Sequence, residues 1–173
     1  MKKAVILLIC FVLAIAVNNA QAQTTECWLS GWVNDKDKSG TNVRATPSAA
    51  SNVVTVFPFA SDDGEQAIVE ITGYENGWLR IRAADTVDGA NLLSEPAWIS
   101  AKLVTASVET KNNKPATLYT LPKRSSPRAG TVPNGVALSI TGVDCFGYKV
   151  LYKGRTGWLA KEDVCGNPVT TCP

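Results

Sequence analysis

Apolar and polar residues alternate along the chain in short runs that turn residues interrupt. Two such runs, residues 67–72 and 78–83, flank a segment ending in Asn76-Gly77, a pair that favours a tight hairpin. Residues 149–152 and 158–160 flank a second turn-rich segment, residues 153–157. No segment after residue 22 keeps a helical period over 11 residues. The pattern therefore predicts an all-β protein.

The same landmarks occur twice along the chain in the same order, which indicates two copies of one structural unit. The matched segments are NVRATP at 42–47 with TLYTLP at 117–122, ITG at 71–73 with ITG at 140–142, and WISAK at 98–102 with WLAK at 158–161. The first copy carries two insertions, one around residues 61–65 and one at residues 85–96. We expect one unit over residues 23–105 and a second over residues 106–173.

The repeat and the two-residue period of strands together predict which side chains face the core. Leu79 and Ile81 in the first copy align with Tyr148 and Val150 in the second, on one alternating face. Trp78 and Arg80 then point to the other face. The second copy has Gly147 where the first has Trp78, so the outer faces of the two copies differ.

The first 22 residues have the pattern of an export signal. Lys2 and Lys3 precede a 14-residue apolar stretch, and Ala20-Gln21-Ala22 forms a small-residue cleavage site. Fourteen residues are fewer than the roughly 20 that a transmembrane helix needs. We predict cleavage after Ala22, with an uncleaved membrane anchor as the alternative. A lipoprotein anchor at Cys10 is disfavoured because bulky Ile9 precedes that cysteine.

Charge and composition restrict the function. The chain has 17 basic and 15 acidic residues, and removal of the two signal lysines leaves 15 of each. A neutral chain without a basic cluster has no electrostatic footprint for nucleic acid or anionic membranes. We therefore expect no nucleic-acid partner and no stable membrane insertion after signal cleavage. The complete absence of histidine excludes Ser-His-Asp triads, Cys-His pairs and histidine-ligated zinc. These counts favour a binding protein without a cofactor.

Four cysteines remain once the signal is removed, and in an oxidising compartment an even number indicates two disulfides. They are Cys27, Cys145, Cys165 and Cys172. Four cysteines allow three pairings, and the sequence leaves the choice open. The shortest closure would join Cys165 to Cys172 and leave Cys27 for Cys145. A metal or redox site is disfavoured because no C-x-x-C spacing is present.

Two segments carry a resemblance to a known family. Residues 42–48, NVRATPS, resemble the N-V-R-x-x-P-S signature that opens bacterial SH3 domains, and residues 148–158, YKVLYKGRTGW, resemble the strand-turn-strand that closes them. Ala97-Trp98 is the first copy's weaker version of the closing Gly-Trp pair. The resemblance implies two small SH3-like β-barrels in tandem after a cleaved signal peptide.

Domains of that family often accompany cell-wall hydrolases and are thought to bind peptidoglycan peptides or other envelope ligands. No such catalytic domain accompanies the repeats in this sequence. The second copy departs from the opening signature, because Leu118 and Tyr119 replace the Val-Arg pair and Lys123 replaces the serine. A ligand role expected for the first copy is therefore not carried over to the second.

The candidate ligand-binding residues are on the outer face of the first copy: Trp78, Tyr74, Arg80 and Arg44. An aromatic ring beside a cation suits stacking against a peptide or a sugar. Two structural alternatives exist. Arg44 could instead hold a neighbouring carboxylate or the turn at Asp35 and Asp37, and the insertion at residues 85–96 could cover Trp78.

The other tryptophans are assigned structural roles. Trp98 and Trp158 each begin a closing strand, and we expect them to anchor the barrel cores. Trp28 and Trp32 share one strand face by parity. We expect that pair to pack into the first barrel or into the seam between the barrels, with an exposed aromatic strip for a partner as the alternative.

The sequence therefore predicts a non-catalytic, periplasmic or secreted binding module for a cell-envelope ligand such as a peptidoglycan peptide. The alternative is a protein–protein adaptor or inhibitor that uses the inter-barrel seam and the first-copy loops to bind an envelope protein. An enzyme would require acidic side chains or a lysine to converge in one pocket.

Overall fold

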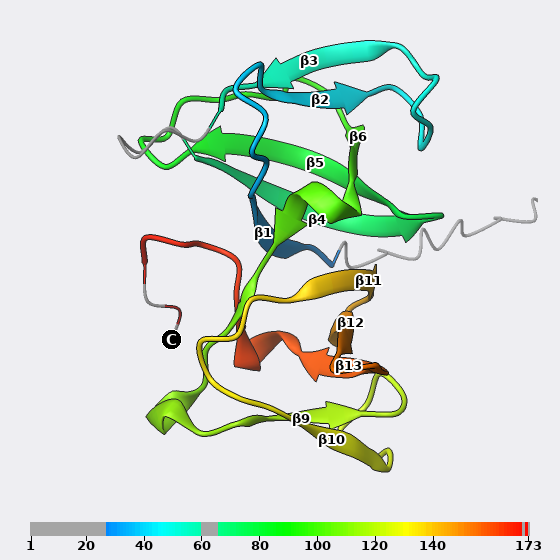
Figure 1. The fold of residues 1–173 in the computed structure, drawn as a ribbon, viewed down its shortest axis with the longest axis vertical. Coiled ribbons are helices and arrows are strands. Elements are labelled where there is room, and N and C mark those ends of the chain that lie inside the picture. The colour runs from blue at the N-terminus through cyan, green and yellow to red at the C-terminus, as the bar shows by residue number, and fades with distance from the viewer. Residues whose placement is uncertain (1–26, 60–65, 171, 173) are drawn as a thin grey trace, which may run out of the picture.

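A computed structural model describes residues 27–59, 66–170 and 172. Within these residues the chain forms β-strands and short 3₁₀ helices and contains no α-helix, so the predicted all-β class is confirmed. Two small barrels built from curved antiparallel sheets stack along the long axis of the molecule (Figure 1). The expected signal segment, residues 1–22, and the first insertion, around residues 61–65, lie outside the described residues.

The first sheet has the strand order β3-β2-β6-β5-β4-β1-β7, in which every neighbouring pair is antiparallel. Its elements are β1 (Leu29–Val33), β2 (Thr41–Arg44), β3 (Val53–Phe57), β4 (Ala67–Glu75), β5 (Trp78–Thr86), β6 (Ala97–Ser100), the 3₁₀ helix η1 (Ala101–Leu103) and β7 (Val104–Thr105). In the described chain, no helix is long and apolar enough to cross a membrane.

The second half of the chain repeats this succession of elements. They are β8 (Ser107–Val108), η2 (Lys111–Asn113), β9 (Ala116–Tyr119), β10 (Arg128–Val132), β11 (Ser139–Val143), β12 (Gly147–Tyr152), β13 (Arg155–Ala160), η3 (Lys161–Asp163) and β14 (Val164–Cys165). The sheet order β10-β9-β13-β12-β11 corresponds to β3-β2-β6-β5-β4, and the pair β8–β14 corresponds to β1–β7. The sequence repeat is thus a repeat of strand topology.

Both long hairpins turn through two residues in the left-handed conformation. Asn76 and Gly77 have φ values of 48° and 86°, and Lys153 and Gly154 have φ values of 47° and 77°. Positive φ at both central positions matches the twist of the flanking strands. The turn predicted over residues 153–157 was too long, because two residues are sufficient and Arg155 already pairs with Tyr152.

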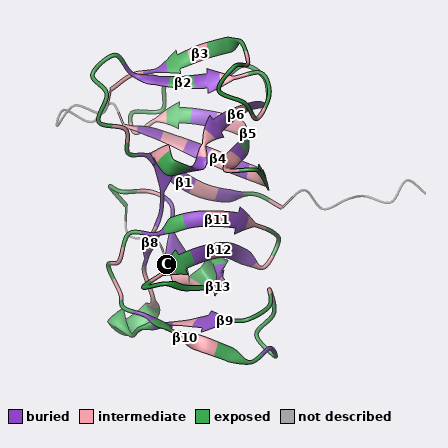
Figure 2. Cartoon of the chain, turned by 45° about the vertical axis from the view of Figure 1, so that its right-hand side comes forward, coloured by how far each residue is buried: buried purple, intermediate pink, exposed green. Residues whose placement is uncertain are grey.

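The predicted core face is confirmed in both copies. Leu79, Ile81 and Val150 are fully buried, and Tyr148 is 2% exposed. Trp78 and Arg80 alternate with these residues and lie on the outer face. Figure 2 shows the resulting pattern, in which buried positions line the strands inside each unit while the edge strands β3 and β10 carry more exposed positions.

The repeated I-T-G segment forms the same β-bulge in both units. After the bulge, Gly73 lies opposite Arg80 and Gly142 lies opposite Lys149. In the second unit the Thr141 hydroxyl donates a hydrogen bond to the Lys149 carbonyl oxygen at 3.2 Å, and a Cβ at position 142 would lie 3.1 Å from the Lys149 Cβ. The glycine therefore leaves room for the basic side chain on the neighbouring strand.

Covalent and polar contacts fix the two units to each other. Cys27 is bonded to Cys145 across the seam, and the second disulfide joins Cys165 to Cys172, which settles the pairing that the sequence left open. The Tyr148 hydroxyl donates a hydrogen bond to the Ser30 carbonyl oxygen at 2.7 Å. Strand β11 of the second unit packs against β4, η1 and β7 of the first.

The buried Tyr148 hydroxyl makes stability depend on alkaline pH. Burial raises the pKa of Tyr148, because the apolar surroundings disfavour the charged phenolate. Because the unfolded chain ionises this group above about pH 10 while the folded chain keeps it neutral, stability is complete below that pH and falls as pH rises.

Tyr148→Phe is expected to remove this contribution to the loss of stability at alkaline pH. It is also expected to lower the free energy of unfolding by about 1 kcal/mol at pH 7, because the hydrogen bond to Ser30 is lost. Urea unfolding of both proteins between pH 7 and pH 11 measures the two effects. Equal slopes of unfolding free energy against pH above pH 10 would contradict the assignment.

Candidate functional site

A row of one tryptophan and two arginines crosses the outer face of the first sheet. Trp98 on β6 pairs with Arg80 on β5 and with Arg44 on β2, so the three side chains project from the same face. Trp78 lies two residues before Arg80 and opposite Ser100. Trp78 and Trp98 are both half-buried, and Arg80 is exposed. We call Arg44, Trp78, Arg80 and Trp98 the outer row.

Arg44 is held by its own hairpin. Its Nη1 donates a hydrogen bond to the Ser51 carbonyl oxygen at 2.6 Å. The alternative in which Arg44 holds the turn at Asp35 and Asp37 is wrong, because Asp35 accepts a hydrogen bond from the Thr41 hydroxyl and Asp37 caps its own turn. The contact with Ser51 fixes the guanidinium on the hairpin whose strand β2 pairs with Trp98.

The structure separates Tyr74 from the other three candidate residues. Tyr74 pairs with Leu79, whereas Trp78 pairs with Glu75, so Tyr74 projects from the face opposite to Trp78. Tyr74 lines a cavity of about 470 Å³ at the seam, together with Lys102 and Ile140. The expectation that Tyr74 extends the Trp78 surface overlooked strand parity, which reverses the face at each residue.

Trp98 and Trp158 are half-buried on outer faces, so the expectation that they anchor the barrel cores was wrong. The neighbours of Trp98, Ala97 and Ile99, are buried, as are the neighbours of Trp158. In the second unit Gly157 faces inward, where a Cβ would lie 2.5 Å from the Leu118 Cγ. The glycine of the Gly-Trp pair meets the core, and the tryptophan faces outward.

The second unit has a different outer row. Trp158 pairs with Lys149 and with Tyr119, the positions equivalent to Arg80 and Arg44. Tyr119 is 8% exposed, and its ring contacts Phe146 edge-on with ring centroids 5.7 Å apart. A buried tyrosine thus replaces one of the two arginines, which makes the first unit the one with two cations beside the tryptophan.

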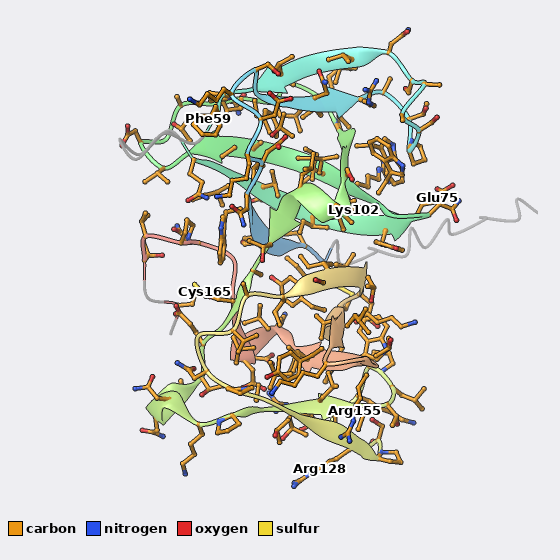
Figure 3. The ribbon with its side chains drawn as sticks, in the orientation of Figure 1. Phe59, Glu75, Lys102, Arg128, Arg155 and Cys165 are labelled. Carbon is orange, nitrogen blue, oxygen red and sulfur yellow. A yellow bond between two sulfur atoms is a disulfide. The ribbon has the colours of Figure 1, made fainter. Side chains whose placement is uncertain are left out.

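A groove of about 850 Å³ lies where the ends of the described chain meet, and we call it the junction groove. The first unit contributes Trp28, Leu29 and Ser30 to its lining. The other lining residues belong to the second unit and are Thr110, Lys111, Lys114, Pro115, Ala116, Thr117, Tyr119, Arg124, Tyr148, Lys161, Glu162, Asp163, Val164, Gly166, Asn167 and Cys172. The C-terminal segment runs beside the seam, and Figure 3 marks Cys165 there. Sequence reasoning missed the groove because its walls come from distant parts of the chain.

Trp28 forms an aromatic wall of the junction groove. It is 45% exposed, and the Arg82 guanidinium lies 5.2 Å from its ring centroid. Arg82 Nε in turn lies 2.7 Å from the Glu70 Oε2, which fixes the cation. Trp28 precedes β1 and is exposed, so the expectation that it packs into the first barrel or the seam was wrong, whereas Trp32 is half-buried and packs against the core as expected.

The acidic residues of the groove are engaged by Arg124. Its Nη2 lies 3.0 Å from the Glu162 Oε2, and its Nη1 lies 4.0 Å from the Asp163 Oδ2. Burial raises the pKa of Asp163, and the charge of Arg124 opposes that shift. Burial alone lowers the pKa of Arg124, but a hydrogen bond with Tyr119 and the two carboxylates outweigh it, so the pKa is raised. Guanidinium-paired, partly exposed carboxylates are typical of a surface ion-pair network.

One group of potential metal ligands lies near the groove. Ligand atoms of Glu109, Cys165 and Cys172 are within 4.8 Å of one another. The two sulfur atoms are bonded to each other, and Glu109 accepts a hydrogen bond from the Cys172 backbone N–H at 3.2 Å. In the oxidised protein the cluster therefore offers a metal only one carboxylate.

No protein-family model and no curated protein matches the chain. Among solved structures, NlpC1 from Trichomonas vaginalis shares 22% identity, with 83% of this chain and 47% of that chain covered and a TM-score of 0.34. The endolysin LysPBC5 CBD shares 16% identity, with 82% of this chain and 95% of that chain covered and a TM-score of 0.33. An NlpC/P60 family protein from Bacillus cereus shares 16% identity, with 78% and 55% covered and a TM-score of 0.26. The chain thus spans about half the length of NlpC1.

Proposed function

We propose that the protein is an exported, non-catalytic binding module that recognises a cell-envelope ligand, a peptidoglycan peptide, through the outer row of the first unit. The observation that carries the proposal is the alignment of Trp98 between Arg80 and Arg44 on adjacent strands. An indole offers a flat apolar surface, and guanidinium groups bind carboxylates through paired N–H donors. Peptides that combine small apolar side chains with free carboxylates match both features.

Two further observations support this role. The two disulfides are typical of proteins that fold outside the cytoplasm, in agreement with the signal segment predicted at residues 1–22. The strands that present the outer row belong to a hydrogen-bonded sheet, and Arg44 is fixed to Ser51. A surface that is ordered before the ligand arrives loses less conformational entropy on binding.

Trp98→Ala is expected to lower retention of the protein on isolated peptidoglycan at least tenfold, because it removes the centre of the outer row. The matched control is Trp158→Ala, which removes the tryptophan at the equivalent position of the second unit and is expected to leave retention unchanged. Co-sedimentation with purified sacculi, alongside urea unfolding of each variant, measures both. Unchanged retention for both Trp98→Ala and Trp78→Ala would contradict the proposal.

A protein–protein adaptor is the second candidate, and edge strand β3 favours it. Val53, Val54 and Val56 are 44–52% exposed, and Val54 borders a cavity of about 530 Å³ that residues 91–96 also line. Exposed apolar edge strands readily pair with another chain. If the protein is an adaptor, Val54→Lys is expected to abolish capture of an envelope protein and to leave retention on peptidoglycan unchanged.

A further inference from the structure

We infer that the junction groove is a second binding site, for short peptides with free carboxylates, and that it acts independently of the outer row. The groove volume of about 850 Å³ falls within the range of about 300–1,000 Å³ that is typical of ligand sites. Its lining contains two kinds of group that bind peptides, basic side chains and the exposed indole of Trp28.

The shape of the groove is fixed by contacts between the two units. Cys27 and Cys145 join the units covalently, and the Tyr148 hydroxyl binds the carbonyl oxygen of Ser30, a lining residue. Gly166 packs so closely on Ser30 that a Cβ at position 166 would overlap the Ser30 carbonyl group. The groove is therefore formed before a ligand arrives, which reduces the entropic cost of binding.

The charges of the lining favour an anionic ligand. Four basic side chains, Lys111, Lys114, Arg124 and Lys161, face two carboxylates, those of Glu162 and Asp163. Arg124 is paired with both carboxylates, and within the described residues the three lysines form no ion pair. All three lysines are exposed and free to reach a ligand carboxylate.

The remaining lining groups favour a peptide over a simple polyanion. Trp28 is 45% exposed, so an apolar side chain of the ligand has an aromatic surface to contact. Glu162 and Asp163 repel a uniformly charged polymer but accept N–H donors from a peptide backbone or an ammonium group. A chain that alternates carboxylates with apolar residues satisfies both kinds of surface.

The test uses fluorescein-labelled Glu-Ala-Glu-Leu-Glu-Ala and its glutamine counterpart Gln-Ala-Gln-Leu-Gln-Ala, titrated with the protein and followed by fluorescence anisotropy. The acidic peptide is expected to bind at least tenfold more tightly than the amide peptide. Lys114→Gln combined with Lys161→Gln is expected to weaken binding of the acidic peptide at least tenfold, and Trp28→Ala severalfold.

The matched control is Lys38→Gln combined with Lys102→Gln, which removes the same charge from two exposed lysines outside the groove. Lys102 lies in η1, the 3₁₀ helix of the first unit that is equivalent to η3 (Figure 3). This control is expected to bind as the unmodified protein does. The titrations are repeated in the Trp98→Ala background, where only the groove is left to bind the peptide, so failure of the groove and failure of the outer row are separate results. Three results would overturn the inference. They are the absence of saturable binding of the acidic peptide, an equal loss of affinity in the two double lysine variants, and binding of a polyphosphate of matched charge as tight as that of the acidic peptide.

Discussion

Replacing Cys27 and Cys145 together with alanine is expected to lower the free energy of unfolding by about 4–5 kcal/mol. The two cysteines are 118 residues apart in the sequence, so the disulfide restricts most of the described chain in the unfolded state. The loop-entropy relation gives about 4.7 kcal/mol for a closed loop of roughly 100 residues. Urea unfolding of the variant and of the oxidised parent measures the difference.

The second disulfide supplies the control for this experiment. Cys165 and Cys172 are 7 residues apart, and the same relation gives only about 2 kcal/mol for so short a loop. Replacing this pair with alanine is therefore expected to cost about half as much or less. Equal losses from the two double variants would show that loop closure is not the source of the larger effect.

Gly166→Ala is expected to cost about 3 kcal/mol and to abolish peptide binding in the junction groove. The new Cβ would overlap the Ser30 carbonyl carbon and oxygen, which are backbone atoms and cannot rotate away. Ser30 must then move, and the hydrogen bond from the Tyr148 hydroxyl is lost with it. The cost lies at the upper end of the usual range for overpacking. Urea unfolding and the anisotropy titration measure the two effects.

Gly73→Ala is the matched control for the substitution at Gly166. A Cβ at position 73 would lie 3.6 Å from the Arg80 Cβ, an ordinary van der Waals contact, with no other contact within 4 Å. Stability is expected to stay within about 0.5 kcal/mol of the parent, since a substitution at a partly exposed position without a clash has small effects. If Gly166→Ala were as stable as Gly73→Ala, the seam would not be held by the Ser30 contact.

The two proposed sites differ in what they require of the fold. The outer row uses β2, β5 and β6 of one sheet, so it depends on strand register within the first unit. The junction groove uses Trp28 and Ser30 from the first unit and residues of the second, so it depends on the seam. Opening the seam by Gly166→Ala should therefore remove peptide binding in the groove and leave peptidoglycan retention through Trp98 intact.

The fold was largely predictable because its determinants are local. Strand alternation identified the buried face at Leu79, Ile81 and Val150, and Asn76-Gly77 identified a two-residue turn. The order of repeated landmarks identified two units with the same succession of strands. Alternation and turn conformation depend on neighbouring residues, so a single sequence carries them.

The candidate sites were predictable only in part. Strand parity correctly placed Trp78 and Arg80 on one face, but the cross-strand register that brings Arg44 beside Trp98 involves β2 and β6, which are about 50 residues apart. Tyr74 was grouped with Trp78 by sequence proximity, although it faces the seam. Trp98 was assigned to the core, although a neighbouring small residue fills the inward position.

The sequence by itself determined an all-β chain of two repeated units with four cysteines available for pairing, because periodicity, turn residues and repeats are properties of consecutive positions. Only the tertiary structure decided which cysteines pair, which tryptophans face outward, and that Trp28, Lys161 and Gly166 meet in one groove. Most of these features arise where segments distant in the sequence pack together, as Cys27 and Cys145 do across 118 residues. Side-chain volume and backbone approach at the seam, as at Gly166 and Ser30, fix that packing.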